Sequence, residues 1–178
     1  MGKVKIALIG VVMLMLGFEV AAPAGASTPG EATRSGTGDH CVLNLVSNAV
    51  GCVSDGSQMD VARRLAAGDN KAALATVVNA KLYKDFITSG TASLEIRSAA
   101  DCTASKSSVE YSIGNLASYS FSDITSSFET FGNCQIRLYD VINCPSSSAT
   151  YPGATTWAGT TTYVGDPFND KATCVYVS

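Results

Sequence analysis

The sequence has a single histidine, His40, among its 178 residues, and none of its cysteines form a Cys-x-x-Cys pair. One histidine excludes a zinc site built from several histidines and the His-Glu-x-x-His chemistry of metalloproteases. Without Cys-x-x-Cys, the usual motif of a thiol redox enzyme is missing. Glycine-rich loops of the Gly-x-x-x-x-Gly-Lys-Ser/Thr or Gly-x-Gly-x-x-Gly type are also absent, so no nucleotide-binding loop is predicted.

Basic residues are few, with 12 Lys and Arg against 15 Asp and Glu. They are scattered, so the chain lacks the basic stripe that a nucleic acid requires, and we expect no nucleic-acid partner. Serine and threonine are plentiful, but no set of nucleophile, base and acid can be assembled around His40, and paired carboxylates at a suggestive spacing are missing. We therefore predict a protein without enzymatic activity.

Long apolar runs are confined to the N-terminus. Two lysines precede an apolar run at Ile6–Phe18, and the small residues Ala24–Ala26 are typical of a signal-peptidase cleavage site. This layout is typical of a secretory signal peptide, and the run is too short to span a bilayer comfortably. We predict that residues 1–26 are removed on export, that the protein is extracellular, and that it has no membrane span.

Residues 27–40 are small and polar, which predicts a flexible lead-in ending at His40. The next segment, 41–90, is predicted to form a β-hairpin at Cys41–Cys52 and then helices. A stripe of apolar residues four apart, from Leu74 to Phe86, indicates a helix. Two interpretations of the helical part remain open: a removable pro-region, or a permanent part of the fold.

From residue 91 onward the sequence has short alternating runs, is rich in serine and threonine, and shows no helical period. Many short strands at this spacing predict an antiparallel sandwich. The segment Leu94–Cys102 matches Ile136–Cys144, and Phe121–Ser127 matches Phe168–Cys174. A repeat of this length indicates a duplicated β module. The two units are predicted at about 91–133 and 134–178.

Six cysteines in an exported chain predict disulfides. Facing residues of a hairpin lie within disulfide reach, and the repeat favours one further bond for each unit. The preferred pairs are Cys41–Cys52, Cys102–Cys134 and Cys144–Cys174. An alternative bond, Cys102–Cys144, would join the equivalent positions of the two units.

Each unit resembles a Greek-key motif of the βγ-crystallin family, whose signature is Asn/Asp-Asn/Asp-x-x-Ser/Thr-Ser. Ser122–Ser127 fits the signature except at its first position, and Asn169–Cys174 fits except at its last. The resemblance implies a mainly β fold in which two tandem βγ-crystallin-like Greek-key motifs form a β-sandwich, preceded by a β-hairpin and short helices. The N-terminal part of the chain also looks like that of exported actinobacterial crystallin-like proteins.

The resemblance implies Ca²⁺ as a ligand, because the signature supplies carboxylate, amide and hydroxyl oxygens, which are hard ligands. By the family pattern, Asp123 and Ser126 belong to one site, and Asp170 and Thr173 to the other. Ser122 and Asn169 occupy the first signature positions. With one carboxylate in each signature, the expected affinity is weak, about 10⁻⁴–10⁻³ M. A purely structural role is the alternative, because these residues also cap turns.

The main prediction is a non-enzymatic extracellular module, and two other functions are alternatives to it. Some crystallin-like relatives are labelled peptidase-inhibitor-like, so a secreted peptidase is one candidate partner, with Ser146–Gly159 and its Trp157 as the candidate loop. Relatives of an antimicrobial or killer-toxin type share the scaffold. The sequence does not identify the biological target or the oligomeric state.

Overall fold

In the computed structural model, the described part of the chain comprises residues 32–85, 92–103, 109–145, 155–158, 163–166 and 169–178. The predicted signal peptide lies outside these residues. None of the helices in the described part has both the length and the hydropathy needed to span a bilayer.

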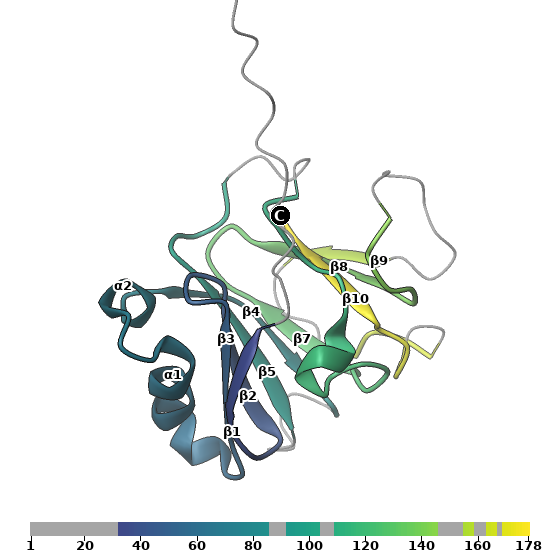
Figure 1. The fold of residues 1–178 in the computed structure, drawn as a ribbon. Coiled ribbons are helices and arrows are strands. Elements are labelled where there is room, and N and C mark those ends of the chain that lie inside the picture. Colours follow the sequence, from purple (N-terminus) through teal and green to yellow (C-terminus); the bar gives the residue numbers. More distant parts are fainter. Residues whose placement is uncertain (1–31, 86–91, 104–108, 146–154, 159–162, 167–168) are drawn as a thin grey trace, which may run out of the picture.

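Two β-sheets are the main regular structure of the described residues, and the helices are few and short, which confirms the mainly β class (Figure 1). The first sheet has six strands, in the spatial order β1 (Thr33–Gly36), β3 (Ala49–Val53), β2 (His40–Asn44), β5 (Ser93–Ser98), β4 (Val77–Tyr83) and β7 (Ser127–Thr130). The second has four, in the order β6 (Tyr111–Ile113), β10 (Cys174–Val177), β8 (Gln135–Tyr139) and β9 (Thr155–Ala158).

The core contains apolar side chains that alternate along strands of both sheets. Leu82, Ile96 and Phe128 from the first sheet share a fully buried cluster with Ile136 and Val175 from the second. Burying side chains of this size stabilises the fold by about 1.5–3 kcal/mol each. The predicted sandwich of two sheets is therefore held together by this shared cluster.

The two sheets exchange segments in the manner of paired Greek keys. Strands β4, β5 and β7 lie in the first sheet, but β6, which lies between β5 and β7 in the chain, pairs with β10 in the second. The segment before β10 in turn joins the first sheet, because the amide of Val164 donates to the carbonyl of Ser126, the residue before β7 (2.8 Å). Strands β4–β7 form one unit and the chain from β8 to β10 forms the other.

The first unit begins earlier than the sequence analysis placed it. Strand β4 starts at Val77, so the boundary expected at residue 90 falls inside the first sheet, between β4 and β5. The helix predicted through Val78 and Leu82 is wrong. Residues four apart share one face of a helix and also of a regular strand, so the spacing alone does not separate the two. In the structure, a bulge between Val78 and Ala80 interrupts the alternation of β4, and Leu82 is buried as part of this strand.

The N-terminal hairpin is integral to the same sheet. Strands β2 and β3 pair as predicted, with Cys41 opposite Cys52, and β2 also pairs in parallel with β5. Because β2 lies between β3 and β5 within the sheet, the structure favours the interpretation that the segment is a permanent part of the fold rather than a removable pro-region.

Part of the expected flexible lead-in is ordered. Strand β1 pairs in parallel with β3. Gly36 permits this approach, because a Cβ there would collide with the carbonyl of Cys52. His40 starts β2, and its Nδ1 lies 3.3 Å from the hydroxyl of Ser93.

Helices cover the outer side of β2 and β3. The main helix is α1 (Met59–Ala67), which follows the 3₁₀ turn η1 (Gly56–Gln58) and precedes the short α2 (Lys71–Leu74). Ala62 and Ala66 of α1 pack on Val42 and Val53 in a second buried cluster. A further 3₁₀ turn, η3 (Leu116–Tyr119), leads from β6 toward the first signature segment.

The structure contains the three preferred disulfides. Their Cα atoms are 4.1 Å apart for Cys41–Cys52, 4.9 Å for Cys102–Cys134 and 5.6 Å for Cys144–Cys174. The alternative bond between Cys102 and Cys144 is therefore excluded. In the chain-entropy view, such bonds each stabilise a fold by about 2–4 kcal/mol.

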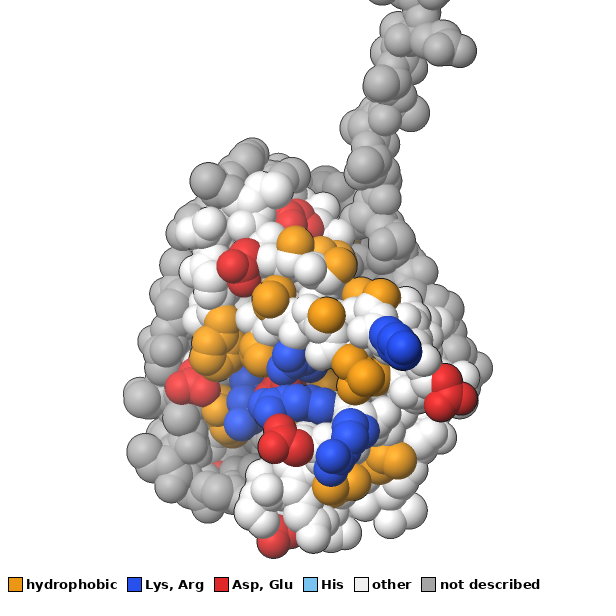
Figure 2. All heavy atoms as spheres, turned by 90° about the vertical axis from the view of Figure 1, so that its left-hand side faces the viewer, with side chains coloured by type: hydrophobic (Ala, Val, Ile, Leu, Met, Phe, Trp, Pro, Cys, Tyr) orange, Lys and Arg blue, Asp and Glu red, His pale blue; other side chains and the backbone are white. Residues whose placement is uncertain are grey.

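A buried carboxylate ties α1 to the first sheet. Glu95 on β5 is 2% exposed and accepts two hydrogen bonds from Arg63 of α1 (2.8 and 2.9 Å) and one from Arg97 (2.8 Å). On the face of the molecule that carries α1, Lys and Arg side chains gather near the centre (Figure 2). Burial alone would raise the pKa of Glu95, but its hydrogen bonds and charge pairing with Arg63 and Arg97 outweigh burial and lower it.

Glu95→Gln removes the buried counter-charge that Arg63 and Arg97 share, so we expect the free energy of unfolding at neutral pH to fall by about 3 kcal/mol. Because folding lowers the pKa of Glu95 from its ordinary 4.5, its contribution is present above that value and is lost as the pH falls through the folded pKa. The free energies of unfolding of wild type and variant, measured by denaturant titration, should therefore begin to converge as the pH falls below about 4.5 and should meet only below the folded pKa of Glu95.

Asp60→Asn is the matched control, because Asp60 pairs with the same Arg63 but its side chain is 83% exposed. Its effect should stay within about 0.5 kcal/mol. A difference between wild type and Glu95→Gln that persists unchanged in acid would contradict the assignment.

Candidate functional site

The two signature segments lie against each other with matching backbone conformations. Asp123 and Asp170 both adopt the left-handed region, with φ of 58° and 54°. The amide of Asp123 donates to the carbonyl of Ala172 (2.9 Å), and the amide of Asp170 donates to the carbonyl of Thr125 (3.2 Å). Each turn is therefore bonded to the corresponding turn of the other unit.

The side chains cross between the units in the same reciprocal way. Thr173 Oγ1 donates to Asp123 Oδ1 and Ser126 Oγ lies equally close to Asp170 Oδ1, both at 3.1 Å. The other carboxylate oxygens accept from neighbours, Ser122 Oγ at 3.1 Å and Asn169 Nδ2 at 2.9 Å. We call the two groups the Asp123 corner (Ser122, Asp123 and Thr173) and the Asp170 corner (Asn169, Asp170 and Ser126).

The structure brings all six predicted residues together but changes their grouping. The signature pattern grouped Asp123 with Ser126, and Asp170 with Thr173, whereas in the structure each aspartate contacts the hydroxyl of the other unit. The chain enters a strand after each aspartate, which carries its own hydroxyl residue toward the opposite turn. One sequence segment cannot reveal this exchange, because it depends on how the two units pack.

The structural repeat also extends to residues that the sequence analysis did not match. The amide of Ser126 donates to the carbonyl of Tyr83 (2.9 Å), and the amide of Thr173 donates to that of Tyr139 (2.8 Å). Tyr83 and Tyr139 are therefore equivalent, and β4 corresponds to β8. The signal was present, because Lys81-Leu82-Tyr83 and Arg137-Leu138-Tyr139 share a cation followed by Leu-Tyr. The repeat predicted from the sequence matched Leu94 with Ile136 and so made β5 the equivalent of β8, whereas in the structure the equivalent of β8 is β4.

Oxygen atoms dominate the surroundings of both corners. Ser126 Oγ also lies 2.5 Å from the carbonyl of Lys84, so its single proton faces two acceptors. Asn169 Oδ1 is buried without a hydrogen-bond partner among the described residues. In that part of the chain no group of three or more His, Cys, Asp or Glu side chains converges. The Asp170 corner thus offers one carboxylate with hydroxyl, amide and carbonyl oxygens around it, and the Asp123 corner offers one carboxylate with two hydroxyls.

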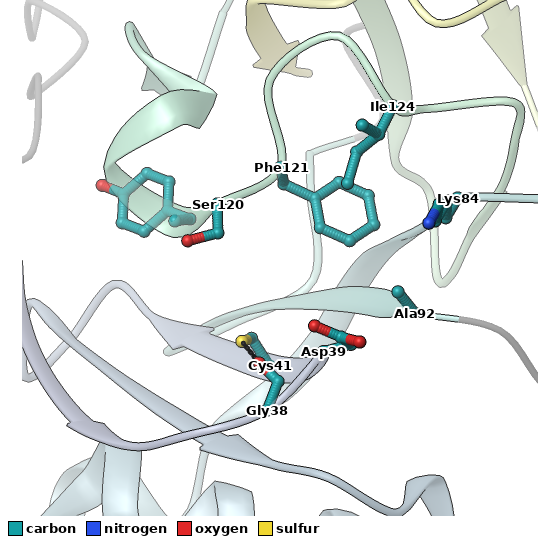
Figure 3. Close-up of a pocket in the computed structure, with 9 residues that line it drawn as sticks. Gly38, Asp39, Cys41, Lys84, Ala92, Ser120, Phe121 and Ile124 are labelled. Atoms are coloured by element: carbon teal, nitrogen blue, oxygen red, sulfur yellow. Dashed lines mark hydrogen bonds between the residues drawn. The ribbon is translucent and has the colours of Figure 1, made fainter.

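A small cavity of about 80 Å³ lies near the segment that leads into the Asp123 corner (Figure 3). Phe121 and Ile124 line it on one side and Asp39 and Cys41 on the other, with Lys84 at its end. Pockets that hold drug-sized ligands measure about 300–1,000 Å³. The cavity therefore does not provide a substrate pocket, and the corners remain the candidate site.

The candidate inhibitor loop lies largely outside the described residues. Of Ser146–Gly159, only strand β9 is described, and its backbone pairs with β8 so that Trp157 stands opposite Ile136. The peptidase-inhibitor hypothesis stays a prediction that these strand positions do not test.

Comparison with known proteins found similarity at the level of structure only. No family model matches the chain, and no curated protein matches it. A βγ-crystallin domain from Clostridium beijerinckii is 18% identical over 56% of this chain and 95% of that chain, with a TM-score of 0.38. A βγ-crystallin domain from Flavobacterium johnsoniae is 22% identical over 56% of this chain and 92% of that chain, with a TM-score of 0.37.

The N-terminal domain of protein S is 12% identical over 56% of this chain and 94% of that chain, with a TM-score of 0.37. The structural neighbours thus include bacterial βγ-crystallin domains. The two-unit arrangement of the present chain follows from its own strand order and from the reciprocal contacts at its corners.

Asp123→Ala should lower the free energy of unfolding by about 1–2 kcal/mol in calcium-free buffer. It removes the acceptor of Thr173 and Ser122, and it places alanine in the left-handed region. Asp123→Asn should cost less, because asparagine tolerates this conformation and still accepts hydrogen bonds. Denaturant unfolding measures both effects. Lys171→Ala, an exposed neighbour of Asp170, should be nearly neutral, and an equal loss in this control would refute the role of the corner.

Proposed function

We propose that this chain is a secreted, non-enzymatic module of the βγ-crystallin type that binds Ca²⁺ weakly, with one ion at each corner. The observation that carries the proposal is the reciprocal pairing of Asp123 with Thr173 and of Asp170 with Ser126. Two equivalent sets of hard oxygen atoms, each with one carboxylate, suit an ion that accepts irregular oxygen coordination.

The donor atoms at the Asp170 corner support a cation in particular. The hydroxyl of Ser126 lies near two acceptors, the carbonyl of Lys84 and the carboxylate of Asp170, and it donates its one proton to only one of them at a time. A cation among these oxygens would replace the unsatisfied contact with a favourable one. The buried Oδ1 of Asn169, unpartnered among the described residues, is a further oxygen of the same corner.

The charge of the corners sets the expected affinity. Asp123 and Asp170 are both exposed, so water competes for the ion, and a single carboxylate neutralises only half of its charge. Sites of this kind in extracellular modules bind Ca²⁺ with dissociation constants of about 10⁻⁴–10⁻³ M. The ion would therefore stabilise the fold where calcium is abundant, outside the cell.

Export is part of the same proposal. Three disulfides persist in oxidising compartments, and the sequence of residues 1–26 has the layout of a signal peptide. We further propose that the module contributes stability and protease resistance through its cross-linked core.

Calorimetric titration of the protein lacking residues 1–26 with CaCl₂ tests ion binding. We expect two weak sites, and a Ca²⁺ concentration ten times the dissociation constant should add about 1.4 kcal/mol per site. For a chain of this size that corresponds to a rise in melting temperature of about 3–6 °C per site. Asp123→Asn and Asp170→Asn should each remove one site, and the double variant should remove both.

Asp69→Asn is the matched control, because it removes a carboxylate from the turn between α1 and α2 and should leave both sites intact. Magnesium should bind less well, since Mg²⁺ demands octahedral geometry and gives up water reluctantly. An absence of heat and of any thermal shift at about ten times the weakest expected dissociation constant would remove the calcium proposal.

A further inference from the structure

In each unit, the residue after the corner hydroxyl is joined to the segment that follows the first strand. In the first unit this residue is Ser127, whose hydroxyl donates to the carbonyl of Asp85, two residues beyond the end of β4. In the second unit the equivalent residue is Cys174, and its partner is Cys144, beyond the end of β8. Ser127 and Cys174 are both fully buried. The two links start from equivalent positions, but one is a hydrogen bond and the other is covalent.

The segment held by Cys174 has an unusual backbone. Asn143 and Cys144 both have positive φ, 64° and 27°, and a cysteine rarely adopts this region. The amide of Asn143 donates to the carbonyl of Gly114 (2.6 Å), and the hydroxyl of Tyr176 lies 2.9 Å from the carbonyl of Cys144. Asn143 and Cys144 are thus held by several contacts in a conformation that the free chain would not favour.

This segment and the Asp123 corner share Thr173. The amide of Thr173 donates to Tyr139, its hydroxyl donates to Asp123, and the next residue is the disulfide-bonded Cys174. Releasing the disulfide would remove the covalent link between the start of β10 and the segment after β8. Sheet hydrogen bonds and the contacts of the Tyr176 hydroxyl with the carbonyls of Cys144 and Pro145 would remain. The corner hydroxyl would then be held less firmly relative to its aspartate.

We propose that the Cys144–Cys174 disulfide is the covalent counterpart of the Ser127 hydroxyl bond and that it positions Thr173 in the Asp123 corner. The consequence is an asymmetry between the two corners: the Asp123 corner depends on the disulfide, and the Asp170 corner depends on Ser127. The backbone part of this inference stands without calcium, and its extension to ion affinity rests on the proposed function.

The experiment uses four variants of the protein without residues 1–26. Cys144→Ala/Cys174→Ala removes the link, and Cys144→Ala/Cys174→Ser places at 174 the hydroxyl that the first unit carries at 127. Cys102→Ala/Cys134→Ala is the matched control, since it removes a disulfide of similar span, 32 residues against 30. Ser127→Ala tests the mirror link and retains every disulfide.

The first measurement is amide exchange of residues 139–145 and 173–175 in calcium-free buffer. Cys144→Ala/Cys174→Ala should speed exchange in these residues by about tenfold or more relative to the Cys102→Ala/Cys134→Ala control, because local opening no longer requires global unfolding. The serine variant should recover part of the protection. Equal exchange in both alanine variants would overturn the positioning role, whether or not calcium binds.

The second measurement is a CaCl₂ titration that follows the amide resonances of Asp123 and Asp170 separately. Loss of the disulfide should weaken binding at Asp123 by about tenfold and leave Asp170 unchanged, and Ser127→Ala should do the opposite. If the double alanine variant fails to fold, Ser127→Ala alone decides, because equal weakening at both corners contradicts the asymmetry. If wild type shows no response to calcium, the proposed calcium binding is wrong. The amide-exchange measurement in calcium-free buffer still decides whether the disulfide positions Thr173.

Discussion

The hydroxyl of Thr173 and the carboxylate of Asp123 belong to different Greek-key units, yet they meet at 3.1 Å, and Ser126 and Asp170 meet at the same distance. These contacts are flanked by backbone hydrogen bonds that also cross between the units. Neither turn can therefore reach its final conformation until the other unit is in place. The left-handed conformation of both aspartates is unfavourable in isolation, so the paired units hold each other in it.

The remaining structure is arranged around this pair of units. Strands β1, β2 and β3 extend the first sheet beyond β5, and α1 covers their outer side through Ala62 and Ala66. Glu95 joins that helix to the sheet through Arg63. The paired units are thus built into a larger domain, in which the N-terminal segment shares the sheet and part of the core with the first unit.

The sequence was sufficient for the mainly β class, for the hairpin at Cys41–Cys52 and for the segments that meet at the corners, because these depend on local pattern. It favoured the three cysteine pairs that the structure contains but left the bond between Cys102 and Cys144 open. It was insufficient for the start of the first unit, because the apolar spacing around Leu82 suits a helix and a strand equally. It was also insufficient for the partner of each aspartate. That partner is set by packing between units, which leaves no trace in the order of residues within one signature.

The most direct test of this account is a pair of double-mutant cycles measured by denaturant unfolding in calcium-free buffer. The account predicts a coupling energy of about 1 kcal/mol between Asp123→Ala and Thr173→Val, across the units. Between Asp123→Ala and Ser126→Ala, within one unit, it predicts near additivity, within about 0.3–0.5 kcal/mol. Strong coupling within the unit and none across it would contradict the reciprocal arrangement.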